Sequence, residues 1–176
     1  LAIFDAHKDN TSAAHALCGV IDAVSFDLDT FYDLDPWIEK LEAYAADFDQ
    51  VPSLELRARM TLSMLNAATL RRPDHPDFPI WEQRGLAFLE TSLPSDIKIR
   101  IILPLITLRI FQGAFTQADY YLQICRQLAE VADTTPLAMI TLKDLEAFHD
   151  AACGRCEQCR RKTEEALNQA SATGIH

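Results

Sequence analysis

Apolar residues recur at helical spacing along almost the whole chain. Ala16, Val20 and Ala23 are spaced i, i+4, i+7, which predicts a helix over about 12–24. No stretch combines period-two alternation with β-branched residues, so no strand is predicted. The predicted fold class is therefore all-α. Further helices are predicted at the approximate positions 36–48, 54–70, 81–89, 96–112, 137–152 and 155–172, and another follows the break at 113–115 and runs to about 131.

Short polar residues and prolines indicate where these helices begin. Asp35 stands directly before a proline, which predicts an N-cap with the proline in the first helical turn. Ser53 and Ser95 are predicted to cap the helices that follow them. The segment 71–79 contains three prolines and is predicted to be a loop. A subdivision of the chain is therefore expected near 71–80.

A glycine-centred corner occurs twice in the second half of the chain. Gly113 and Gly154 stand 41 residues apart, and each separates two predicted helices. Such recurrence is typical of stacked helical hairpins that bury their faces against their neighbours. We therefore expect 1–176 to form one array, a right-handed superhelical stack of antiparallel helix hairpins with about eight or nine helices. Residues at matching positions, spaced i, i+4, i+7, follow the two glycines. They are Ala118, Leu122 and Cys125 after Gly113, and Cys159, Thr163 and Ala166 after Gly154.

The segment 113–118, with the sequence Gly-Ala-Phe-Thr-Gln-Ala, resembles the inter-helix turn and second-helix start of a tetratricopeptide repeat. Ala118, Leu122 and Cys125 match the small, large and small packing positions of that repeat. The spacing of 41 residues departs from its usual length of about 34. The Trp-Leu-Gly-Tyr pattern of its first helix is replaced here by Ile102, Leu105, Ile106 and Arg109.

Longer hairpins of this kind are similar to the helical region of MalT-type ATP-dependent bacterial transcriptional regulators, as are the linker 72–81 and the C-terminal segment 164–176. The resemblance implies a larger protein with an ATPase part, a helical sensor array and often a DNA-binding output. The chain has no Gly-x4-Gly-Lys-Ser/Thr phosphate loop and no basic recognition helix. We therefore expect a non-catalytic sensor or protein-interaction module without a cofactor. Because the chain starts at Leu1, we expect an internal piece of a longer protein.

Composition narrows the classes of partner. The chain has 26 acidic and 16 basic residues and a net charge of -10, which argues against direct binding of nucleic acid or of an anionic membrane. The longest apolar run, 101–108, is far shorter than the ~20 residues of a membrane span. The odd count of five cysteines favours the reducing cytoplasm.

The expected partners are a protein, a peptide or a small-molecule effector, together with other domains of the same polypeptide and a second copy of the chain. In a helical array such partners dock on the concave face, where aromatic and arginine side chains act as anchors. The candidate contact residues are Tyr120, Tyr121, Arg109 and Arg126.

A cluster of thiols offers an alternative function. Cys153, Cys156 and Cys159 form a C-x2-C-x2-C run that could hold zinc or an iron–sulfur cluster, with His149 as a fourth ligand. The function would then be that of a metal- or redox-responsive domain. The preferred interpretation is packing, because Cys159 takes the place of Ala118 in the preceding unit and free cysteine behaves as a small apolar residue.

Acidic residues and a loop histidine are further candidates for a chemical site. The carboxylates between 22 and 50 lack the Gly and Glu of a calcium loop, which favours a solvated acidic face. His75 stands between Asp74 and Asp77, but no Gly-x-Ser-x-Gly nucleophile elbow is present, so we interpret it as a loop or interface residue. A di-metal helical enzyme would need Glu-x-x-His pairs, which the sequence lacks.

Overall fold

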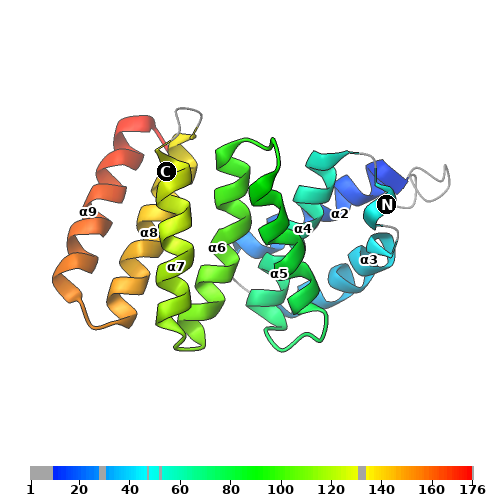
Figure 1. Ribbon diagram of the computed structural model, residues 1–176, viewed down its shortest axis with the longest axis horizontal. Helices are drawn as coiled ribbons and strands as arrows, with labels where there is room; N and C mark the ends of the chain where they lie inside the picture. Colours follow the sequence, from blue (N-terminus) through cyan, green and yellow to red (C-terminus); the bar gives the residue numbers. More distant parts are fainter. Residues whose placement is uncertain (1–9, 28–30, 47, 52, 131–133, 176) are drawn as a thin grey trace. The chain divides into compact units, whose positions relative to one another are not determined.

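A computed structural model describes residues 10–27, 31–46, 48–51, 53–130 and 134–175. These residues form eight α-helices and three short 3-10 segments and contain no strand, which confirms the predicted all-α class (Figure 1). The chain divides into two compact units, Leu1–Thr91 and Ser92–His176. The division falls after the proline-rich segment 71–80. None of the described helices has both the length and the apolar content that crossing a membrane requires.

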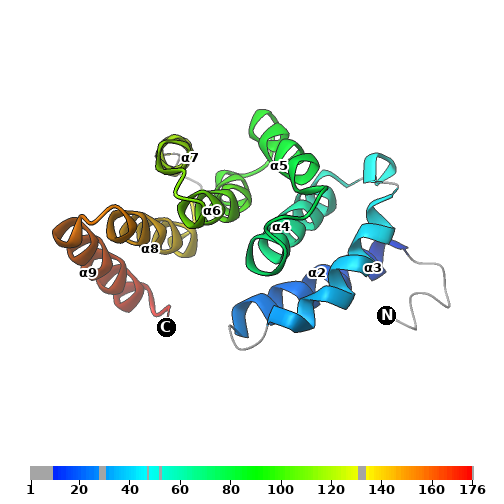
Figure 2. The ribbon, with the colours of Figure 1, turned by 90° about the horizontal axis from the view of Figure 1, so that it is seen from below.

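The first unit is built around one central helix, α4 (Leu54–Arg71). Leu56, Met60 and Leu65 of α4 are almost fully buried, and buried residues occur on every side of the helix, as expected where neighbours surround it. These neighbours pack around α4 in Figure 2. They are α2 (Asn10–Asp27), α3 (Asp35–Ala45) and α5 (Phe78–Ala87), joined by the 3-10 segments η1 (Phe31–Leu34), η2 (Phe48–Gln50) and η3 (Phe88–Glu90).

The predicted caps of the first unit have different outcomes. The Oγ of Ser53 accepts the N–H of Leu56 at 3.2 Å, which confirms Ser53 as the N-cap of α4. Asp35 makes no capping bond, and that prediction is wrong. Its carboxylate instead accepts hydrogen bonds from Arg71 at 3.0 and 2.7 Å and from Arg72 at 3.0 Å. Two guanidinium groups at the end of α4 thus take the oxygens that a cap would use.

The proline-rich loop is shorter than predicted. We expected the helix to begin near Trp81, but α5 begins at Phe78. Pro79 lies in its first turn, where a missing backbone N–H costs nothing because that group has no partner within the helix. The third proline of 71–79 therefore belongs to the start of the helix and not to the loop.

The second unit consists of four helices, each joined to the next by a short connection. They are α6 (Ser95–Phe111), α7 (Phe115–Ala129), α8 (Pro136–Ala152) and α9 (Cys156–Thr173). The helix α6 packs on α7 and α8, and α8 also packs on α9. Ile99, Ile102 and Leu105 of α6 are fully buried, and the helix continues across Pro104. The predicted end of α7, Val131, lies outside the described residues.

The cap predicted at Ser95 is wrong by one residue. Ser95 is the first residue of α6, and Pro94 occupies the N-cap position with an extended ψ of 148°. A helix N-cap residue needs this non-helical backbone conformation, which proline adopts readily. The boundary is therefore set by Pro94, and the Ser95 side chain is buried inside the unit.

The two glycine corners have the same backbone structure. Gly113 and Gly154 have φ values of 70° and 74°. The N–H of Ala114 donates to the carbonyl of Arg109, and the N–H of Arg155 donates to that of Asp150, both at 2.8 Å. These are the bonds by which a left-handed residue ends a helix. The 41-residue recurrence in the sequence thus corresponds to a repeated turn between α6 and α7 and between α8 and α9.

The side chains after the two corners are buried to different degrees. Ala118 and Leu122 of α7 are fully buried, whereas the matching residues of α9, Cys159 and Thr163, are half-buried and exposed. The reason is that α7 packs against both α6 and α8, while α9 packs mainly against α8. The two segments therefore resemble each other more closely in their turns than in the burial of the side chains that follow.

The glycine corners generate a prediction about stability. Replacement of Gly113 or Gly154 by Ala should each lower the free energy of unfolding by about 1–2 kcal/mol, because a side chain disfavours positive φ. No atom lies within 4 Å of the added Cβ, so backbone strain is the cause. Gly19→Ala is the matched control: this glycine lies inside α2, and alanine should gain up to about 1 kcal/mol there. Denaturant unfolding measures all three, and a stabilised Gly154→Ala variant would contradict the assignment.

Candidate functional site

A charged groove crosses three helices of the second unit. It has a volume of about 320 Å³ and is formed by α7, α8 and α9, the neighbouring helices of Figure 2. Its floor includes the apolar side chains of Met139 and Leu142. The charged residues that line it are Arg126, Glu130, Lys143, Glu146, Arg161, Lys162 and Glu165.

Ion pairs connect the helices along this groove. Glu146 of α8 accepts a hydrogen bond from Arg126 of α7 and lies 3.6 Å from Lys162 of α9. Glu165 of α9 lies 3.1 Å from Lys143 of α8 and 2.6 Å from Arg161. The hydrogen bond from Lys143 is the main cause that lowers the pKa of Glu165 below its ordinary value. The groove is thus bounded by a network in which carboxylates of α8 and α9 each hold two cations.

The cations of the groove are more exposed than the carboxylate at its centre. The side chains of Arg126 and Arg161 are 49% and 61% exposed, whereas that of Glu146 is 13% exposed. Both guanidinium groups are therefore open to solvent, and the carboxylate that pairs with Arg126 is more sheltered than Glu165, the 40% exposed partner of Arg161. The Arg161–Glu165 pair is exposed on both sides, and such a pair is worth only about 0.2–1 kcal/mol, so an incoming carboxylate can replace Glu165 at little cost.

The predicted contact residues do not gather in one place. Arg126 lines the groove. Tyr120 is 61% exposed on α7, whereas Tyr121 is buried, although their rings lie 5.6 Å apart. Arg109 donates to the side chain of Gln112 at 2.9 Å, a contact within its own helix end. Sequence reasoning missed the other groove residues, although the i, i+3 spacing of Lys143 and Glu146 and the i, i+4 spacing of Arg161 and Glu165 were visible signals.

The thiols lie around the turn between α8 and α9. Cys153 Sγ lies 3.7 Å from Nε2 of His149, which is buried and receives Arg155 Nη2 at 3.0 Å on its other ring nitrogen. Cys156 is exposed and Cys159 is half-buried. Within the described residues, these thiols and His149 do not form a group whose ligand atoms all lie within 4.8 Å of one another.

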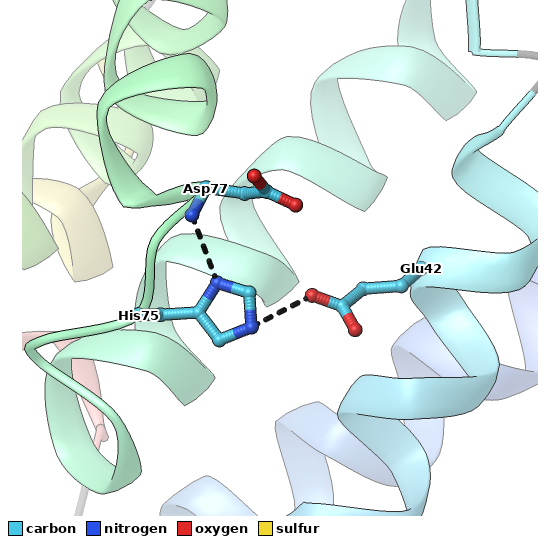
Figure 3. Close-up of side chains that lie close together, drawn as sticks. All are labelled: Glu42, His75 and Asp77. Atoms are coloured by element: carbon cyan, nitrogen blue, oxygen red, sulfur yellow. Dashed lines mark hydrogen bonds and ion pairs between the residues drawn. The ribbon is translucent and has the colours of Figure 1, made fainter.

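A different cluster of metal-ligating side chains lies in the first unit. Glu42 of α3, His75 and Asp77 each offer one ligand atom, and these atoms all lie within 4.8 Å of one another (Figure 3). The Nε2 atom of His75 lies 2.9 Å from Oε1 of Glu42, and Nδ1 accepts the backbone N–H of Asp77 at 3.2 Å. The sequence analysis interpreted His75 as a loop or interface residue and the carboxylates between 22 and 50, which include Glu42, as a solvated face, so it did not predict this cluster.

A cavity lined by polar and apolar side chains also belongs to the first unit. It has a volume of about 530 Å³ and is bounded by α2, α3, η2 and α4. Tyr44, Asn10 and Gln50 supply polar groups, and Leu56 and Met60 supply apolar walls. None of the described residues that line it is charged.

No protein-family model, curated protein or solved structure matches the chain. The function is therefore argued from the side chains themselves.

The buried carboxylate at the α8–α9 turn generates a prediction about pH. Asp150 is 4% exposed and pairs with Arg155 at 2.7 Å and with Lys162 at 2.8 Å. Burial alone would raise the pKa of Asp150, but hydrogen bonds from Lys162 and Arg155 outweigh it and hold the pKa below its ordinary value. Asp150→Asn should therefore lower the free energy of unfolding at neutral pH by about 1–3 kcal/mol.

The loss of stability in Asp150→Asn should be largest at neutral pH and smaller in acid. A carboxyl group whose folded pKa is depressed stabilises the fold above its unfolded pKa of about 3.9, and this contribution is lost as the pH falls through the folded value. The difference between the wild-type protein and Asp150→Asn should shrink on acidification below that pH in denaturant titrations. Asp144→Asn, at an exposed position of the same helix, is the control and should change stability by less than about 0.5 kcal/mol. A difference that stays constant down to pH 2 would refute the role of the charge.

Proposed function

We propose that this chain is a non-catalytic helical-repeat module of a larger cytoplasmic bacterial signalling or transcription-regulating ATPase. In this proposal the groove across α7, α8 and α9 binds an acidic segment of a protein or peptide partner. The observation that carries it is the groove itself, in which cations from two helices stand at the rim above an apolar floor. The all-α fold and the repeated glycine corners are consistent with this class of protein.

The proposal also includes the way in which the helices of the second unit stack. The hairpins α6–α7 and α8–α9 would be two units of a right-handed superhelical stack like that of tetratricopeptide-like regions in MalT-type regulators. Support comes from the identical turns at Gly113 and Gly154 and from the packing of α8 on both α6 and α7. In such a stack, a bound partner would change the angle between hairpins and so pass a signal to other domains of the polypeptide.

The charges of the groove define the chemistry of the partner. Arg126 and Arg161 offer guanidinium groups that suit planar carboxylates. Met139 and Leu142 offer apolar surface for a side chain between two acidic residues. A peptide with carboxylates on both sides of an apolar residue therefore fits the groove better than a basic or wholly polar segment.

A second candidate function is that of a thiol-based redox- or metal-responsive domain. The observation that favours it is the contact between Cys153 Sγ and His149 Nε2. Arg155 donates to Nδ1 of this histidine, so Nε2 carries the proton of the neutral ring and can donate it to a thiolate. Uniform reaction rates of all exposed and half-buried thiols with an alkylating reagent, equal to those of the unfolded chain, would remove this candidate.

The groove proposal generates a prediction about binding. The probe is a Glu-rich peptide with leucines between its carboxylates, compared with the same peptide carrying Gln in place of Glu. Amide NMR shifts should move on α7, α8 and α9 with the Glu peptide and stay unchanged with the Gln peptide. Arg161→Ala should weaken binding about two- to fivefold, the loss of one exposed ion pair.

Arg160→Ala is the matched control for this experiment. Arg160 lies on the same helix, has a side chain that is 60% exposed, and pairs with Glu164 at 2.6 Å much as Arg161 pairs with Glu165, but it does not line the groove. It should leave binding unchanged. Equal weakening by both variants would reject the groove as the site. Shifts confined to the cavity of α2, α3 and α4 would reject it in favour of an effector site in the first unit.

A further inference from the structure

Three side chains of different origin meet beside the loop that precedes α5. Glu42 lies on α3, whereas His75 and Asp77 lie in the segment that connects α4 with α5 (Figure 3). The imidazole is 11% exposed and the Glu42 side chain is 28% exposed, whereas Asp77 is exposed, so the cluster opens to water on the side of Asp77. Such a grouping depends on the tertiary fold, because the glutamate is separated from the other two by the whole of α4.

The glutamate oxygen in this cluster faces the imidazole of His75. Oε1 of Glu42 is buried and lies 2.9 Å from Nε2 of His75, but the contact does not have the geometry of a hydrogen bond. A cation bound between the two atoms would satisfy the buried carboxylate oxygen better than this contact does. The side chains of Glu42 and Asp77 also line a shared pocket of about 260 Å³, which provides room for an ion and its water ligands.

The guanidinium of Arg84, which lines this pocket, lies over two aromatic rings. The guanidinium of Arg84 lies 4.1 Å from the centre of the Phe48 ring and 4.6 Å from that of Trp81. Cation–π contacts of this kind hold the charge over the ring faces. No ion pair of Arg84 with Glu42 or Asp77 is found in the described structure. The carboxylates of Glu42 and Asp77 therefore lie near the His75 ring, and Arg84 does not neutralise them.

The donor set indicates the class of ion. One imidazole nitrogen with two carboxylate oxygens suits zinc and neighbouring divalent transition metals, whereas calcium and magnesium prefer oxygen ligands alone. Ligands bound to zinc lie about 2.0–2.2 Å from the metal, so atoms that lie within 4.8 Å of one another must move closer together to share an ion. Three protein ligands leave a coordination position for water.

We propose that Glu42, His75 and Asp77 bind a zinc-class divalent transition-metal ion. The ion would replace the proton on Nε2 of His75, and the ring proton would move to Nδ1. The 3.2 Å contact between Nδ1 and the Asp77 N–H would then open, which frees the Asp77 segment to bring its carboxylate to the ion. The site joins α3 to the start of α5 and is independent of the groove in the second unit.

The experiment uses Co²⁺ as a spectroscopic substitute for zinc, added to the full chain in reducing, chelator-free buffer. The wild-type protein should bind one equivalent with d–d absorption and without a thiolate-to-cobalt charge-transfer band. His75→Asn should lose at least about tenfold in affinity, since even outer-shell substitutions cost that much. Asparagine keeps an acceptor near the position of Nδ1 for the Asp77 N–H but has no group in place of Nε2. Glu42→Gln should lose affinity in the same way, and Co²⁺ should raise the Tm of the wild-type protein but not that of these two variants.

Two controls distinguish this site from other metal ligands in the chain. Asp74→Asn changes an exposed acid beside His75 and should bind Co²⁺ like the wild-type protein. A variant with serine at Cys153, Cys156 and Cys159 should also bind normally. The proposal is overturned if Co²⁺ does not bind at stoichiometric concentration, if His75→Asn binds with unchanged affinity, or if a charge-transfer band appears and vanishes in the serine variant. Circular dichroism checks that each variant keeps its helix content, and the His75→Asn result stands alone if Glu42→Gln fails to fold.

Discussion

Burial of apolar side chains between neighbouring helices is the constraint on which the rest of this molecule depends. A single helix of 10 to 18 residues is at best marginally stable alone in water, so each one here needs a partner to cover its apolar face. The chain meets that need with tight reversals, and Gly113 and Gly154 adopt the positive φ that two of these reversals require. Once the reversal is fixed, the register of α7 on α6 and of α9 on α8 follows, and so does the position of every charge on their surfaces.

Features that depend on neighbouring residues could be predicted from the sequence, and features that depend on distant residues could not. The all-α class, the glycine corners and the cap at Ser53 follow from backbone chemistry within one turn of helix. The cap expected at Asp35 fails because Arg71, in another helix, takes its carboxylate. Burial after the second corner differs for the same reason: Cys159 matches Ala118 in sequence, yet burial is decided by how many helices cover the position.

The candidate sites show the same limit. Periodic spacing identified Arg126 as a candidate contact, but it gave no reason to join that residue with Glu146 and Lys162, which meet it only after three helices have packed. His75 and Asp77 were visible as neighbours in a proline-rich loop, whereas Glu42 comes from α3. In both cases some of the side chains could be found in the sequence. Which of the many acidic residues lies next to them depends on the packing of the helices.

The net charge of -10 does not conflict with an acidic partner. The repulsion by the whole chain and the attraction by the arginines of the groove act at different distances. At physiological salt the Debye length is about 8 Å, so most of the chain's carboxylates are screened from a ligand in the groove. A carboxylate at the rim would instead be governed by Arg126 and Arg161, whose side chains are only partly covered. The overall charge would slow the approach of acidic molecules, and the local pairs would decide which of them remain bound. Selectivity would thus come from contacts that form only when an acidic segment also fits the apolar floor.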